Sequence, residues 1–229
     1  MIEANIEISR SDIKEIKRRL GAFEDKTPDV LSRAINRTVA SIKTELKREV
    51  AKHYRIAQKD VAVTLNDKKA TSKQLYGCVE SKGTVIPLLK FSVSPMRTVT
   101  YNDYGEPNPS HYSAAVFKGH GLIPLDHNPK AFVAIMSNGH GGIFERTGRW
   151  KSERHSKQTR EANRGPNERA HSKHNEIIKE LKGPSVPHMI KNQEVIATIR
   201  DKAESTLHKR IDAEINYILS KGAAKNDGA

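Results

Sequence analysis

The sequence of 229 residues has a single cysteine, few aromatic side chains and no long apolar run. One cysteine, Cys78, excludes an intramolecular disulfide and every zinc site built from several cysteines. The longest apolar run, Ala131–Met136, is far shorter than the roughly 18 residues of a membrane-spanning helix. Because Met1–Asn5 has neither a basic start nor an apolar stretch, we expect neither secretion nor membrane insertion, and we expect synthesis in the cytosol.

Catalytic patterns are also missing. The histidines lack the carboxylate or cysteine companions of a metal site, and Ser185 and Cys78 lie outside any nucleophile motif. The glycine-rich segment 138–142 is typical of a hairpin turn, where glycine permits positive φ and His140 would bond to nearby backbone. We therefore expect no catalytic residue, no metal and no cofactor.

Positive charge is abundant: 40 Lys and Arg residues against 27 Asp and Glu residues give a net charge of +13. Residues 148–175 hold eight basic and three acidic residues and no Val, Ile, Leu, Met or Phe, which predicts a solvated basic insertion unless a partner orders it. Two interpretations stay open, namely sequence-independent contact with nucleic-acid phosphates and bases, or a loop that is solvated or faces a protein. The candidate contact residues are Arg149, Trp150, Lys151, Arg154, Lys157, Arg160 and Arg164.

Helical periodicity marks both ends of the chain. A short helix is predicted from a cap at Ser9 or Ser11 to Gly21. A helix of about 26 residues is predicted to follow, with its N-cap at Thr27 and an apolar stripe that reaches Val50. A further short helix is predicted within Tyr54–Leu65. Apolar residues recur every three or four positions from Asn192 to Lys221, which predicts another long amphipathic helix.

Alternating and apolar segments in the middle of the chain indicate strands. They lie at 75–80, 89–93, 131–136, which we expect to be buried on both faces, and 143–146; a last strand covers 177–181. Segment 101–111 is predicted to be a loop, and the prolines of 183–187 to fix a turn without ladder pairing. Short connections favour one antiparallel sheet.

The expected fold is therefore α+β, with a central antiparallel sheet flanked by long N- and C-terminal amphipathic helices and one long basic insertion. We expect a single domain, 1–229. Its parts are a helical N-terminal part at 1–70, a sheet core at 71–147 and 176–190, the basic insertion at 148–175 and a C-terminal helix at 191–221.

Two blocks of sequence carry a resemblance to a known family. Ala131–Arg146 contains the run Phe-Val-Ala-Ile-Met-Ser-Asn-Gly-His-Gly-Gly-Ile-Phe-Glu-Arg, and Glu180–Met189 contains Gly-Pro-Ser-Val-Pro. Together with similar segments at 31–38, 54–61 and 86–91, they resemble minor tail protein Z, the tail completion protein of lambda-like siphophages. The block residues, which carry over as fold and assembly positions only, are Phe132, Gly139, His140, Gly142, Phe144, Arg146, Gly183, Pro184, Ser185 and Pro187.

The resemblance implies a structural virion protein rather than an enzyme. Its expected place is the neck of a tailed bacteriophage, where it completes the tail for head-tail joining and DNA delivery after assembly in the host cytoplasm. The implied partners are copies of itself in a ring, the tail terminator, the tail tube and the head-connector proteins, together with the backbone of packaged DNA. The alternative is a free, sequence-independent DNA-binding protein that acts through the basic insertion.

Overall fold

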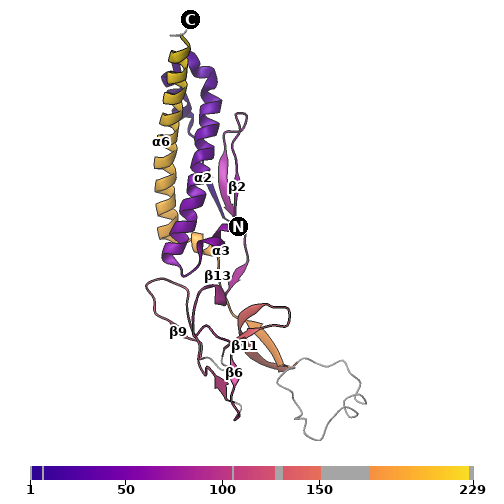
Figure 1. Ribbon diagram of the computed structural model, residues 1–229. Helices are drawn as coiled ribbons and strands as arrows, with labels where there is room; N and C mark the ends of the chain where they lie inside the picture. Colours follow the sequence, from indigo (N-terminus) through magenta and orange to yellow (C-terminus); the bar gives the residue numbers. More distant parts are fainter. Residues whose placement is uncertain (1, 7, 105, 127–130, 151–175, 227–229) are drawn as a thin grey trace, which may run out of the picture. The chain divides into compact units, whose positions relative to one another are not determined.

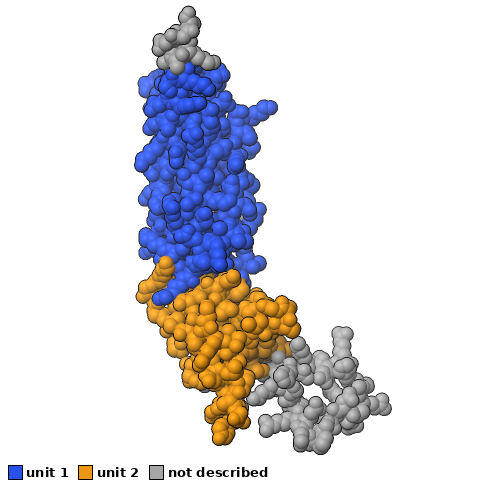
Figure 2. Space-filling view, viewed as in Figure 1, with its two compact units in different colours: residues 1–85, 184–229 blue, residues 86–183 orange. Residues whose placement is uncertain are grey.

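The computed structural model describes five stretches of the chain, namely 2–6, 8–104, 106–126, 131–150 and 176–226. The chain divides into two compact units (Figure 2), with residues 1–85 and 184–229 in unit 1 and residues 86–183 in unit 2. The chain crosses between the units in β4 (Val85–Pro87) and β13 (Lys182–Ser185), which pair with each other. Unit 2 is thus an insertion, in sequence, between the two halves of unit 1.

Helices dominate unit 1, as the sequence predicted (Figure 1). Its elements are β1 (Ile2–Ile6), α1 (Arg10–Leu20), the 3-10 helix η1 (Gly21–Lys26), α2 (Thr27–His53), α3 (Gln58–Ala62), β2 (Leu65–Lys68), β3 (Gly77–Ser81), α5 (Val186–Ile190) and α6 (Gln193–Asn226).

The ends of the N-terminal helices show which local sequence signals predicted the helix boundaries correctly. Ser9 caps α1 by accepting a hydrogen bond from the backbone of Asp12, and Gly21 ends the helix, which confirms both predicted boundaries. The prediction of Thr27 as an N-cap is wrong. Thr27 is the first helical residue of α2, because η1 leads directly into the helix and the Thr27 hydroxyl donates to the Glu24 carbonyl.

The two long helices α2 and α6 pack side by side and antiparallel (Figure 1). The apolar stripe predicted on α2 is buried along its whole length, from Leu31 to Val50. At one end of the pair, α1 completes a core made of Ile16, Leu20, Val30, Leu31, Ala34, Ile211 and Ile215.

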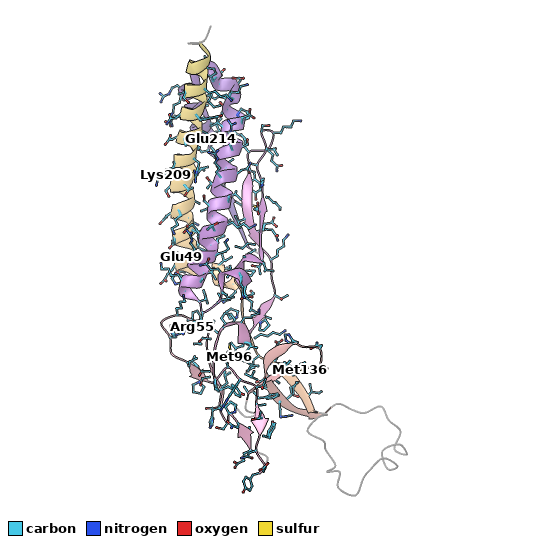
Figure 3. The ribbon with its side chains drawn as sticks, viewed as in Figure 1. Glu49, Arg55, Met96, Met136, Lys209 and Glu214 are labelled. Carbon is cyan, nitrogen blue, oxygen red and sulfur yellow. The ribbon has the colours of Figure 1, made fainter. Side chains whose placement is uncertain are left out.

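A buried carboxylate joins the two helices. Glu214 of α6, labelled in Figure 3, is only 3% exposed. It accepts contacts from Arg33 Nε at 2.9 Å and Arg37 Nη1 at 2.7 Å, both from α2. Two guanidinium groups thereby compensate the charge of one buried carboxylate.

A three-stranded antiparallel sheet in the order β1-β3-β2 covers another side of α2. Its central strand β3 was predicted, whereas β1 and β2 were not. Gly77 in β3 allows the close approach, because a Cβ at this position would lie 2.7 Å from Ile35 Cγ2. The lone cysteine, Cys78, is buried in the same strand.

Unit 2 consists of short strands. They are β5 (Ser92–Ser94), β6 (Thr100–Tyr101), β7 (Pro107–Asn108), β8 (Ser113–Ala115), β9 (Ile123–Pro124), β10 (Phe132–Ile135), β11 (Gly141–Trp150) and β12 (Glu176–Glu180), with the 3-10 helix η2 (Leu88–Lys90). They form the sheets β5-β8-β9, β6-β7 and β10-β11-β12.

The α+β class is therefore confirmed, but the single central sheet is not what the described residues show. In the part of the chain that the structure describes, five small sheets replace it, and four of them are antiparallel in every pairing. Proline explains part of the fragmentation, because Pro95, Pro107, Pro109 and Pro124 supply no backbone donor and stop ladders from extending.

Three local predictions for the sheet region are corrected. Residues 88–90 form η2 rather than a strand, because Pro87 precedes them and the backbone bonds locally. Ile135 of β10 is 66% exposed, so this strand is not buried on both faces. Segment 183–187 is no isolated turn, because Gly183 and Pro184 lie in β13 and α5 follows directly.

Candidate assembly site

The first sequence block folds into a hairpin in unit 2, formed by β10 and β11. Phe132 pairs directly with Phe144, and Val133 pairs with Ile143. Because successive side chains alternate between faces, the two phenylalanines share one face and the two buried aliphatic residues the other. The phenylalanine rings are 6.1 Å apart between centroids.

The turn of this hairpin depends on glycine, as predicted. Gly139 has φ +82°, a conformation that other residues rarely adopt. Met136, labelled in Figure 3, closes the turn by donating its backbone N–H to the His140 carbonyl at 2.8 Å. The Asn138 side chain accepts from the His140 backbone N–H at 3.0 Å.

The His140 ring makes a contact that the sequence did not predict. Instead of bonding to nearby backbone, His140 Nε2 lies 2.8 Å from Glu180 Oε1 of β12. Its ring meets the Phe144 ring edge-on, with centroids 6.4 Å apart. Strand pairing brings the two side chains together, because it places Glu180 directly opposite Phe144.

Gly142 provides the space for this cluster. A Cβ at Gly142 would lie 2.9 Å from Glu180 Oε1 and 2.9 Å from Phe144 Cζ. On the same face, the guanidinium of Arg146 lies 5.2 Å from the centre of the Phe132 ring, within range of a cation–π interaction. One hairpin face thus gathers Phe132, His140, Phe144 and Arg146 around a glycine.

The second block begins with another close approach. Gly183 is buried, and a Cβ there would lie 2.5 Å from Phe91 Cε2 and 3.0 Å from Phe91 Cζ. The Phe91 ring is itself only 4% exposed. Gly183 therefore allows β13 to lie directly against the edge of this ring.

The rest of the second block starts a helix in unit 1. Ser185 is the N-cap of α5, and its hydroxyl accepts a long hydrogen bond, 3.4 Å, from the His188 backbone. Pro187 follows in the first turn, where a missing N–H costs nothing. Pro187 is buried along with Val186, Met189 and Ile190.

The structure thus brings the predicted positions of the first block together in one hairpin, and most positions of the second block lie elsewhere. The residues of the first block and Gly183 lie in unit 2, whereas Pro184, Ser185 and Pro187 lie in unit 1. Arg149 and Trp150 lie near the end of β11. The remaining candidate contacts, Lys151, Arg154, Lys157, Arg160 and Arg164, lie outside the described residues, as does most of the basic insertion.

Two residues of the site, Glu180 and Phe91, were not predicted from the sequence. Glu180 contacts His140, about 40 residues away in the chain, and Phe91 lies against Gly183, about 90 residues away. Glu180 could have been suspected, since it is the one carboxylate in the second block. No local signal marks Phe91 as the partner of a glycine.

The surface of unit 2 exposes many large apolar side chains. Tyr104, between β6 and β7, is 91% exposed. Among the described residues of unit 2, the other exposed large apolar side chains are Met96, Tyr101, Phe117, Leu122, Ile123, Ile135 and Ile177. Those of unit 1, again among the described residues, are Val63, Val85, Tyr217 and Leu219.

The described part of the chain contains no group of three or more His, Cys, Asp or Glu side chains that could hold a metal ion. No described helix is long and apolar enough to cross a membrane.

Tyr112 of unit 2 has a shifted pKa, because burial raises the pKa of its phenol. The Tyr112 hydroxyl donates to the Arg97 carbonyl at 2.8 Å, so this group has a structural role.

The hairpin, the glycine contacts and the helix pair place the two sequence blocks at positions that shape the fold. Comparison with known families shows which family carries such blocks. The model of prophage minor tail protein Z (GPZ) matches residues 12–222, and the chain belongs to this family of phage tail proteins. No curated protein and no solved structure matches the chain.

Proposed function

We propose that this protein completes the phage tail at the neck, where it supports head-tail joining and DNA delivery as a ring of identical copies. Membership of the minor tail protein Z family, which covers nearly the whole chain, is the observation that carries the proposal. In this proposal the neighbours are the tail terminator, the tail tube and the head connector. The protein is assembled into the virion in the host cytoplasm.

The surface of unit 2 supports a role in assembly. Large exposed aromatic side chains are enriched where proteins meet. Tyr104 presents its ring from a turn that Asn102 stabilises, since Asn102 Oδ1 accepts from the backbone of both Tyr104 and Glu106. Such a preorganised tyrosine loses little conformational entropy when a partner covers it.

A stop codon at Ala4 tests the neck assignment. We expect filled heads and tails of near-normal length, because a finishing component joins after the tube has grown. The particles should fail at joining or at DNA delivery. Negative-stain counts of heads, tails and joined particles, with an infectivity titre, measure this, and complementation with the intact gene is the control. A normal titre would refute the assignment, and absence of tails would move the protein to tail initiation or tube polymerisation.

Direct DNA binding through the basic insertion is the second candidate, favoured by the charge of residues 148–175. The same complementation assay tests DNA binding with a variant in which six basic residues are replaced by Gln. These residues are Arg149, Lys151, Arg154, Lys157, Arg160 and Arg164. If the insertion contacts DNA, genome retention or ejection should fall and its salt dependence should flatten. An unchanged phenotype would favour a solvated or protein-facing loop.

A further inference from the structure

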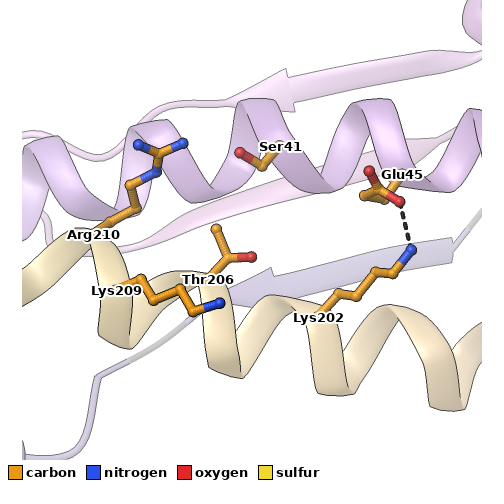
Figure 4. A pocket seen from close by; sticks show the side chains of 6 residues that line it. All are labelled: Ser41, Glu45, Lys202, Thr206, Lys209 and Arg210. Atoms are coloured by element: carbon orange, nitrogen blue, oxygen red, sulfur yellow. Dashed lines mark hydrogen bonds and ion pairs between the residues drawn. The ribbon is translucent and has the colours of Figure 1, made fainter.

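A polar groove of about 460 Å³ runs between α2 and α6 (Figure 4). Ser41 and Glu45 of α2 line one side. The side formed by α6 is lined by Lys202, Thr206, Lys209 and Arg210. Three cations and one carboxylate therefore face the same groove.

Ion pairs connect α2 and α6 one helical turn before Ser41 and one turn after it; each such turn is called a level of the helix pair. One turn further along α2, Glu45 binds Lys202 of α6 at 2.6 Å and Arg48 at 2.8 Å. One turn earlier, Arg37 binds Glu214, which also binds Arg33. At both levels a single carboxylate is held by two cations.

The level of Ser41 has the cations but lacks the carboxylate. Neither Lys209 nor Arg210 forms an ion pair or a side-chain hydrogen bond with any residue in the described part of the chain, and both are exposed. In Figure 4 both come from the part of α6 that follows Thr206, on the side away from Lys202, and Thr206 lies across from Ser41. Ser41 is neutral and its hydroxyl donates to the Arg37 carbonyl, so α2 has no carboxylate at this turn of the helix, one turn before Glu45.

We propose that this groove binds a carboxylate side chain of an acidic partner protein, held by Lys209 and Arg210. The acid would complete the row of two-cation contacts between α2 and α6. This rests on the proposed assembly role for the identity of the partner, which would be a neighbouring virion protein. The net charge of +13 favours an acidic partner over a second copy of the chain.

The charge pattern favours a single carboxylate over a nucleic-acid backbone. DNA carries one negative charge for about every 1.7 Å of its axis, so it needs an extended basic surface. Helix α6 has six basic and five acidic residues, and Glu45 lies within the groove itself. A phosphate backbone would meet these carboxylates, whereas one acidic side chain needs only the position beside Thr206.

Two variants of the purified full-length chain with equal net charge provide the test. The groove variant is Lys209→Gln with Arg210→Gln. The control is Lys14→Gln with Lys59→Gln, since these exposed lysines of unit 1 lie outside the groove. Both changes are on the surface, and circular dichroism checks that each variant is folded.

The probes are a fluorescein-labelled helical peptide with glutamate at every fourth position, the same peptide with glutamine instead, and a 20-base-pair DNA duplex. We expect the groove variant to bind the glutamate peptide about tenfold more weakly than the control variant does, because two charge-assisted contacts are lost. Both variants should bind the DNA equally well.

Equal binding of the glutamate peptide by the two variants would overturn the proposal. A greater loss of DNA binding than of peptide binding in the groove variant would replace the acidic protein by nucleic acid, and would also overturn it. Since the measurement uses purified protein and anisotropy, its outcome does not depend on the infectivity assay. Failure of the neck assignment and failure of the groove proposal are therefore distinguishable.

Discussion

Replacing Gly183 by alanine should destabilise unit 2 through a single steric contact. The added Cβ would lie 2.5 Å from Phe91 Cε2, well inside van der Waals contact, and the ring is 4% exposed and cannot swing into solvent. Overpacking of this kind costs about 1–3 kcal/mol. With a urea slope of about 2 kcal/mol/M, a loss of about 2 kcal/mol lowers the unfolding midpoint by about 1 M.

Tryptophan fluorescence in urea is the assay, because the single tryptophan, Trp150, lies in β11 of unit 2. Gly121→Ala is the matched control, since a Cβ at Gly121 meets nothing within 4 Å. Adding Phe91→Leu to Gly183→Ala should relieve the clash, so the double change should cost less than the sum of the two single changes.

The reasoning fails if Gly183→Ala and Gly121→Ala give the same midpoint. It fails equally if the costs of Gly183→Ala and Phe91→Leu simply add, because the ring would then not be the cause. Either result would mean that β13 shifts away from the ring at no measurable cost.

Two further predictions concern the helix pair. Glu214→Gln should lower the thermal midpoint of the helical circular dichroism signal, with a loss of about 1–3 kcal/mol, because the buried partner of Arg33 and Arg37 becomes neutral; an unchanged midpoint would contradict this. The hydrogen bond from Lys202 holds the pKa of Glu45 below its ordinary value of 4.5, so this contact stabilises the fold fully above pH 4.5 and is lost as the pH falls through the lowered pKa. Lys202→Met should flatten the dependence of unfolding free energy on pH below 4.5, as measured by urea titrations at several pH values.

The long helices could be predicted because their signals are local. The apolar stripe of α2, its Pro28 in the first turn and the cap at Ser9 all lie within a few residues of the structure they produce. Strand β2 could not be predicted in this way, because Leu65 is its one apolar residue. In strand β1, Ile2, Ala4 and Ile6 do alternate with polar residues, but an alternation of five residues is a weak signal by itself. Both strands pair with β3.

The candidate assembly site also combines features that the local sequence predicts with contacts that depend on long-range strand pairing. The turn at Gly139 follows from its own sequence, since only glycine suits the conformation found there. The contact of His140 with Glu180 depends on the register of β12 against β11, which no local pattern specifies. Residue types therefore predicted where the chain turns, and long-range pairing decided which side chains meet.

The insertion of unit 2 within unit 1 imposes an order on folding during synthesis. The contact between Glu45 and Lys202 closes a separation of 157 residues, and all of unit 2 is translated in between. At about 5–20 residues per second, the ribosome needs roughly 8–30 s to make that length. Throughout this interval the apolar stripe of α2 has no helix α6 to cover it, so the nascent N-terminal half is a natural client for chaperones. Chains that terminate within unit 2 should aggregate rather than accumulate as soluble fragments.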